Sequence, residues 1–282
     1  MDLENNTNST VNTQNGETNF EDSNSITLFG ADIQKQIAEL AHRVLQCIEE
    51  ADVDEMSDSI KNTISSLDSL DGEKDKKFLF FSKKAIARDD DNKRYDALKR
   101  VEGMENVLDK HRVQLLMDSA LYDQMYKMSQ DYVEKLSEKI SIARTKIEEM
   151  KVKAKSVSPE EAKWFENTVM HIERRVEELE LAKVVSTQQS AQIRILQDNA
   201  TSMARGIQST LYNVIPLWKN QISIELNNIK AKKRTSNTES EEYKANKMLI
   251  ESLGEISYIN EESKNKKKTA GSELNALISK KK

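Results

Sequence analysis

The segment of the chain from residue 179 to residue 214 decides the fold, and it reads LELAKVVSTQQSAQIRILQDNATSMARGIQSTLYNV. Its mostly apolar seam positions recur at alternating spacings of three and four residues. This is the repeat of a helix that packs lengthwise against another helix. The seam positions are Leu179, Ala182, Ser186, Gln189, Ile193, Leu196, Ala200, Met203, Ile207, Thr210 and Val214. The spacing therefore predicts a long helix of the coiled-coil type.

The ends of this helix carry local signals. Ser158 is a good N-cap residue, Pro159 suits the first helical position, and Glu161 can complete a capping box with Ser158. Pro216 lacks a backbone N–H and clashes with the preceding turn, so we predict a kink there. The helix is expected to continue beyond the kink and to span about residues 158–233.

An earlier segment of the chain has the same repeat and predicts a second long helix, over about residues 92–155. Its seam positions are Val101, Met104, Leu108, His111, Leu115, Asp118, Tyr122, Met125, Ser129, Tyr132 and Leu136. Only a short connection separates the two predicted helices, which therefore form an antiparallel pair.

The composition supports the same fold class. The 282 residues include 32% charged residues but only 7 Gly and 2 Pro, too few breakers for the turns of a sheet protein. We therefore predict an all-α protein, an elongated antiparallel helical bundle or coiled-coil hairpin of two long helices with shorter N-terminal helices. Residues 1–27 are predicted to be a disordered polar tail, residues 28–235 the helical domain, and residues 236–282 a short helix and a basic tail.

Charge and cysteine content limit the cellular setting. A formal net charge of −5 gives no field suited to nucleic acid, and no apolar run is long enough to span a bilayer. The N-terminus lacks the basic and apolar regions of a signal peptide. The single cysteine, Cys47, excludes an intramolecular disulfide and is expected to be a small buried side chain in a cytoplasmic protein.

Two segments offer a peripheral contact with the inner face of a membrane. Phe78, Leu79, Phe80 and Phe81 form an apolar cluster between lysine pairs, and residues 264–282 are rich in lysine. The alternatives are that the phenylalanines fill the end of the bundle and that the lysine segment is a solvated tail.

The polar seam positions are the candidate ligand-binding residues. His111 and Asp118 lie seven residues apart, which places them on one helix face about 10 Å apart along the axis. A site there would also need side chains from the opposing helix, and the candidates are Gln189, Gln192 and Arg194. The alternative is a buried polar layer that fixes the register of the two helices.

The sequence contains no catalytic, cofactor or metal motif. The three histidines, His42, His111 and His171, fall on three separate predicted helices without the HxxxH spacing of a zinc site. Phosphate-binding loops, dinucleotide fingerprints and nucleophile elbows are also missing. We therefore expect no cofactor, no metal and no enzymatic activity.

Three segments resemble signatures of the TelA-type toxic anion (tellurite) resistance family. Residues 108–126, LDKHRVQLLMDSALYDQMY, are similar to the first signature of that family. Residues 189–199, QSAQIRILQDN, and residues 215–222, IPLWKNQI, are similar to two further elements in the same order. Ala191 stands where the family often has proline, and the C-terminal region looks unlike the usual extension.

The resemblance implies a role in stress or oxyanion resistance. Reduction of tellurite needs thiols or a redox cofactor, so we expect a non-enzymatic protein that acts through protein partners. The candidate partner contact is Pro216, Trp218 and Lys219, with a core position for Trp218 as the alternative. Two other functions stay open. One is a structural coiled-coil adaptor at the membrane face without an anion role. The other is an anion- or metal-binding protein that uses His111 and Asp118.

Overall fold

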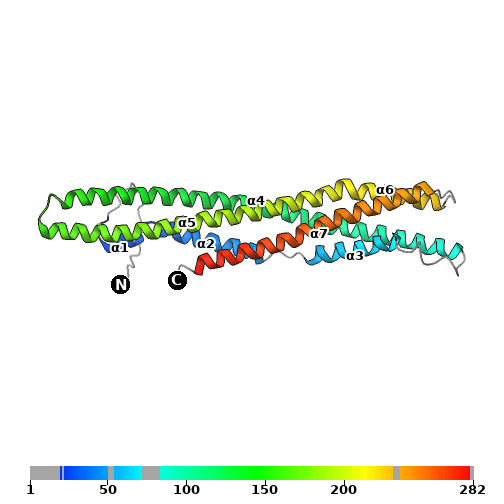
Figure 1. Ribbon diagram of the computed structural model, residues 1–282, viewed down its shortest axis with the longest axis horizontal. Coiled ribbons are helices and arrows are strands. Elements are labelled where there is room, and N and C mark those ends of the chain that lie inside the picture. Colours follow the sequence, from blue (N-terminus) through cyan, green and yellow to red (C-terminus); the bar gives the residue numbers. More distant parts are fainter. Residues whose placement is uncertain (1–19, 21, 50–53, 72–82, 231–235, 280–282) are drawn as a thin grey trace, which may run out of the picture. The chain divides into compact units, whose positions relative to one another are not determined.

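The structure is a computed structural model that describes residues 20, 22–49, 54–71, 83–230 and 236–279. Within these ranges all regular elements are helices, which confirms the predicted all-α class (Figure 1). The helices are α1 (Ser23–Leu28), α2 (Ala31–Glu49), α3 (Asp54–Asp71), α4 (Lys83–Ala154), α5 (Pro159–Ser209), the π-helical segment η1 (Thr210–Val214), α6 (Ile215–Lys230) and α7 (Ser236–Ser279). Residues 78–81, which we considered for membrane contact, lie outside the described residues.

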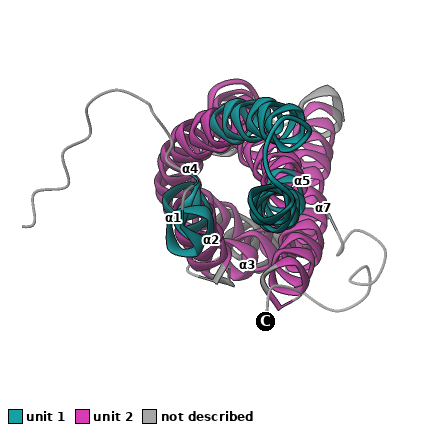
Figure 2. Cartoon of the chain, turned by 90° about the vertical axis from the view of Figure 1, so that its left-hand side faces the viewer, with its two compact units in different colours: residues 1–35, 134–183 teal, residues 36–133, 184–282 magenta. Residues whose placement is uncertain are grey.

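The chain divides into two compact units, coloured separately in Figure 2. Unit 1 comprises residues 1–35 and 134–183, and unit 2 comprises residues 36–133 and 184–282. The long helices α4 and α5 contribute residues to both units, and in each unit they run antiparallel.

Unit 1 contains the connection between α4 and α5. The predicted capping box is present, because the Ser158 backbone N–H donates to Glu161 Oε2 at 3.2 Å and the Glu161 N–H donates to Ser158 Oγ at 3.4 Å. These bonds satisfy backbone donors that the first turn of α5 would otherwise leave exposed, so α5 begins at the predicted residue.

The described part of the predicted N-terminal tail differs from our expectation. Asp22 caps α1 by accepting a hydrogen bond from the Ser25 N–H at 2.7 Å, and Phe20 is only 2% exposed. The ring of Phe20 packs edge-on against Phe29, whose carbonyl accepts a hydrogen bond from the buried Arg175 guanidinium of α5. Ordered structure in this region therefore begins before residue 28, because two aromatic rings are buried together.

Unit 2 holds an apolar core built by α3, α4, α5, η1, α6 and α7. Its buried members are Met56, Ile60, Leu67, Ala97, Val101, Met104, Leu108, Met203, Ile207, Leu211, Ile215, Trp218, Ile222, Leu226, Ala245, Leu249, Leu253 and Ile256. Helix α7 lies beside α3 and α6 over much of this core (Figure 1).

The π turn η1 changes which residues face the core of unit 2. The seam of α5, extended at heptad spacing, would place Leu217 and Ile224 inside, yet these are 50% and 40% exposed. Trp218 and Ile222 are buried instead, one residue out of phase. A π turn holds one extra residue, and the Ile215 N–H donates to the Thr210 carbonyl five residues earlier. The irregularity expected at Pro216 is therefore a π turn that lies just before it.

The C-terminal region corrects a second expectation. We predicted a short helix followed by a basic tail over residues 236–282, but α7 extends to Ser279. Ala270 and Leu274 are buried within the lysine-rich part, and Gly271 faces Leu45 and Ile48 of α2. The lysines alternate with these inward residues, so the segment is an amphipathic helix that packs on α2.

Candidate functional site

The first family-like segment, residues 108–126, has two different faces. Its inward face buries Leu108, Tyr122 and Met125 in unit 2. Between them, at the same seam spacing, the partly buried His111 and Asp118 line a cavity. The two polar residues predicted from the seam therefore line one space.

The cavity lies within unit 2 and has a volume of about 490 Å³. Five helices, α2, α3, α4, α5 and α7, supply its walls. The lining residues are Cys47, Glu55, Met56, Lys110, His111, Gln114, Leu115, Asp118, Leu121, Met203, Asn260, Ser263, Lys264 and Lys267. Cys47 is partly exposed here rather than fully buried as expected, because it borders this space.

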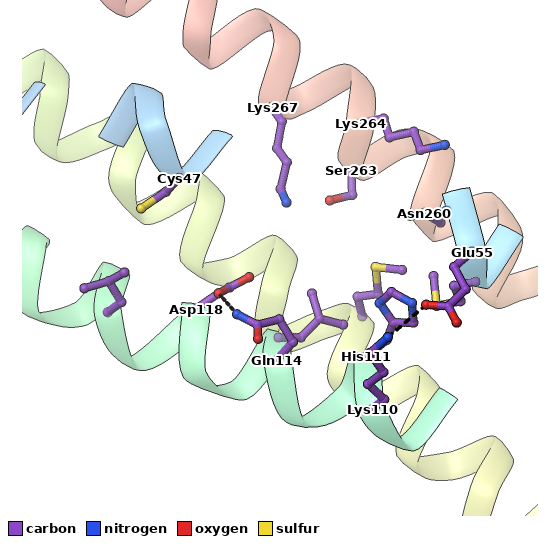
Figure 3. Close-up of a pocket in the computed structure, with 14 residues that line it drawn as sticks. Cys47, Glu55, Lys110, His111, Gln114, Asp118, Asn260, Ser263, Lys264 and Lys267 are labelled. Carbon is purple, nitrogen blue, oxygen red and sulfur yellow. Dashed lines mark hydrogen bonds and ion pairs between the residues drawn. The ribbon is translucent and has the colours of Figure 1, made fainter. Parts of the chain in front are cut away.

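The wall formed by α7 is polar at the level of His111 and Asp118. Leu253 and Ile256 are buried before it, and Ala270 is buried after it. Between them the inward positions are Asn260, Ser263 and Lys267. Figure 3 shows Lys267 and Ser263 projecting from α7 toward Asp118 and Gln114 of α4. Both α4 and α7 thus carry polar residues at inward positions where they border the cavity.

Two pairs of side chains fix part of the cavity wall. Lys110 Nζ lies 2.9 Å from Glu55 Oε2, and this hydrogen bond is the main reason that the pKa of Glu55 is lowered. The Asp118 carboxylate accepts a hydrogen bond from the Gln114 amide at 2.8 Å. The first pair neutralises itself at the rim, whereas the Asp118 side chain lines the interior.

The electrostatics of the inner wall are set by burial. Burial lowers the pKa of Lys267, while the charges of Asp118 and Cys47 act in the opposite direction. Burial is also the main reason that the pKa of the Tyr122 hydroxyl is raised, and Asp118 and Cys47 add to that increase. In this interior an unpaired charged side chain is destabilised by burial, and a neighbouring group of opposite charge stabilises it.

The remaining candidates from α5 do not join this cavity. Gln189 is buried, but it lies beside a separate cluster in which Ser190 Oγ donates to Ser129 Oγ at 2.8 Å and Ser129 Oγ donates to the Ser186 carbonyl at 3.0 Å. The predicted polar layer is therefore split, with its serine part forming hydrogen bonds across the α4–α5 seam of unit 2.

Gln192 and Arg194 also lie away from the cavity. The Gln192 amide donates a hydrogen bond to Glu273 of α7. The Arg194 guanidinium donates to Gln197 Oε1 at 2.8 Å and stacks over the Tyr126 ring at 5.4 Å from its centroid. Both side chains connect surface positions of unit 2.

The candidate partner contact near the π turn is different from the exposed site that we considered. Trp218 is 0% exposed, and its indole N–H donates to Asn246 Oδ1 at 2.6 Å. Lys219 pairs with Glu105 of α4, and Pro216 is exposed. Trp218 is therefore a core residue, the alternative left open by its position after the proline.

Sequence reasoning missed the α7 side of the cavity. Asn260, Ser263 and Lys267 continue the helical spacing of Leu253 and Ile256, and this continuation was a usable signal. The nearby lysines obscured it, because a lysine-rich C-terminus is typical of a solvated tail.

Neither a membrane span nor a metal cluster is found in the described part of the chain. No helix there is long and apolar enough to cross a bilayer. Within the same residues, no group of three or more His, Cys, Asp or Glu side chains is placed to hold a metal ion.

The fold and the cavity define an all-α protein with a cavity of mixed polar and apolar lining inside a helical unit. The sequence profile of the family described as toxic anion resistance protein (TelA) matches residues 11–240. The chain therefore belongs to the TelA family, as the resemblance of its three signature-like segments indicated.

Proteins similar to this chain are found in staphylococci. A TelA-like protein of Staphylococcus saprophyticus is 27% identical over 91% of this chain and 82% of its own length. TelA-like proteins of Staphylococcus aureus strains Mu50 and N315 are 25% identical over 73% of this chain, and the match spans 59% of their length. No solved structure matches the chain.

Proposed function

We propose that this chain contributes to tolerance of tellurite or a related toxic anion without catalysing a reaction, by binding a protein partner. The family description supports the anion role. The proposal for a partner rests on one surface feature, the outer face of α4 within residues 108–126.

Four large apolar side chains are exposed on this outer face. Val113, Leu116, Met117 and Leu121 are 40–62% exposed and lie within three turns of α4. Single exposed apolar residues are ordinary, but a contiguous group marks an interaction surface. We call these four residues the α4 stripe.

The spacing and the surrounding charges favour one kind of partner. Val113, Met117 and Leu121 recur every fourth residue, the ridge that packs into the groove of another helix. The neighbouring cations are paired within the chain, since Arg112 contacts Asp109 at 2.7 Å and Lys127 contacts Asp123 at 2.7 Å. A paired rim offers little attraction to an anionic membrane, so the apolar face of a partner helix is the better match.

A complementation experiment tests this function. A strain that lacks the gene would carry the wild type, a Leu116→Ser/Met117→Ser variant or a Leu181→Ser/Val184→Ser control at matched protein levels. The control removes two equally exposed apolar side chains from α5. We expect the wild type and the control to restore growth on tellurite and the stripe variant to fail, although it folds with unchanged helicity.

Two results would contradict the proposal, each in a different way. Full rescue by the stripe variant would exclude the α4 stripe as the partner surface. Unchanged tellurite tolerance in the deletion strain would exclude the anion role itself.

A further inference from the structure

The cavity in unit 2 has features of a binding site that simple packing does not require. A seam that only fixes register needs polar residues in contact with each other, as Ser129, Ser186 and Ser190 are. At the level of His111 and Asp118 the polar residues of α4 and α7 instead border a space of about 490 Å³. A volume of that size admits a small ligand and its water molecules.

The charges around this space are arranged asymmetrically. Lys110 and Glu55 pair with each other, and Lys264 lies near Glu261 at 3.3 Å toward the surface. Lys267 and Asp118 remain as the charges that face each other across the interior (Figure 3). The cavity therefore presents one strong donor group on α7 and one strong acceptor group on α4.

Hydrogen-bonding groups accompany both charges. Ser263 projects into the space beside Lys267, and Asn260 lies one turn before it on the same wall. His111 and Gln114 supply further polar groups from α4. Burial disfavours the charged form of Lys267, so an anion beside it would offset a cost that the unliganded protein bears.

We propose that this cavity binds a small oxyanion that retains a proton near neutral pH, such as hydrogen phosphate or hydrogentellurite. Lys267 and Ser263 donate to its charged oxygens, and Asp118 accepts the hydrogen bond from its O–H group. The inference goes beyond the α4 stripe and does not depend on it, because the polar groups that α4 gives to the cavity are not part of the stripe. Only Leu121 belongs to both.

Asp118 is the residue that selects this class of anion. A carboxylate inside an anion site repels a fully deprotonated ion such as sulfate, but it accepts a hydrogen bond from a protonated oxyanion. A site built to bond an O–H group discriminates strongly against a ligand that lacks one. The cavity should therefore bind hydrogen phosphate or hydrogentellurite and reject sulfate of the same size.

Calorimetric and thermal-shift titrations of the full chain test this inference. Sodium phosphate, tellurite and sulfate would be added at constant ionic strength near neutral pH. We expect the first two to raise the melting temperature and sulfate to leave it unchanged. The Lys267→Met variant should bind phosphate and tellurite about tenfold more weakly or worse, since it loses a charged hydrogen bond.

Two further variants make the result specific. Lys268→Met removes an exposed lysine next in the chain and should bind like the wild type. Asp118→Asn removes the repulsion and should gain affinity for sulfate. The inference is overturned if neither phosphate nor tellurite binds, if Lys267→Met binds them like the wild type, or if the wild type binds sulfate equally well. Circular dichroism of each unliganded variant establishes that it is folded.

Discussion

The ammonium group of Lys267 is partly buried in the cavity wall, and burial lowers its pKa below the ordinary value of about 10.4. The folded protein therefore holds this proton less tightly than the unfolded chain. Burial of the charged ammonium group lowers the free energy of unfolding. This loss is complete below the lowered pKa and disappears as the pH rises toward about 10.4, so Lys267 makes stability increase with pH in that window.

Replacing Lys267 with methionine should remove this penalty. We expect Lys267→Met to be more stable than the wild type at pH 7 in the absence of ligand, and the difference to shrink as the pH approaches about 10. Urea denaturation at pH 7 and pH 9.5 measures both effects. A variant that is less stable than the wild type at pH 7 would show that Lys267 holds the cavity together.

Trp218 illustrates how burial determines the effect of a mutation. Truncation of this fully buried ring, Trp218→Ala, should lower the free energy of unfolding by about 3–5 kcal/mol, because it leaves a large cavity in the core of unit 2. Trp164→Ala is the matched control, since that ring is 45% exposed, and it should cost less than about 1 kcal/mol. Chemical denaturation measures the free energy of unfolding of both variants. Similar decreases in the two variants would argue against the core position of Trp218.

Single residues differ in how far their role could be predicted from the sequence. The Ser158 and Glu161 capping box was predictable, because its partners are three residues apart and its hydrogen bonds are local. His111 and Asp118 were identified as polar seam positions, but the seam alone left open whether they packed or lined a space. Lys267 was hidden, because its burial depends on helices that are distant in the sequence.

Among the elements, α7 departs most from expectation. Its C-terminal half is helical and contributes Ala270 and Leu274 to the buried surface of unit 2, with Gly271 against α2. The segment looked like a tail because polar residues occupy its inward positions at the level of the cavity. An apolar stripe is the usual sign of a packed helix, and the cavity interrupts that stripe.

The packing of α7 predicts a clear mutational effect. Leu274→Ala should reduce the free energy of unfolding by about 2–5 kcal/mol, because the leucine is buried. Leu217→Ala, which truncates a half-exposed leucine on α6, should cost less than about 1 kcal/mol. Urea denaturation compares the two, and an unchanged stability of Leu274→Ala would restore the interpretation of this segment as a solvated tail.

At the scale of the whole molecule, composition and periodicity were sufficient for the all-α class and for the antiparallel long helices. The signature-like segments were sufficient for the family, which the profile match over residues 11–240 shows. The cavity could not be predicted, because five helices contribute to it and periodicity says nothing about which seams face each other. The residues of its α4 wall could be identified from the sequence, whereas those of its α7 wall could be identified only from the structure.

The two faces of the α4 segment suggest a division of roles within unit 2. The inward face lines the cavity through His111 and Asp118, and the α4 stripe lies outward except at Leu121, which also borders the cavity. A ligand and a partner would therefore contact the same three or four turns of one helix from opposite sides. The variants described above separate the two roles, because Leu116 and Met117 do not line the cavity and Lys267 and Asp118 are not part of the stripe.

The π turn at Thr210–Val214 also bears on how the gene can change. In a regular helix, loss or gain of one codon rotates all later side chains by about 100° and turns the core face toward solvent. Inside η1, loss of one codon would convert a π turn into an α turn and leave Trp218 and Ile222 facing inward. The core of unit 2 should therefore tolerate the deletion of one residue within η1. The same deletion in the neighbouring turns of α5 or α6 would turn the buried side chains outward.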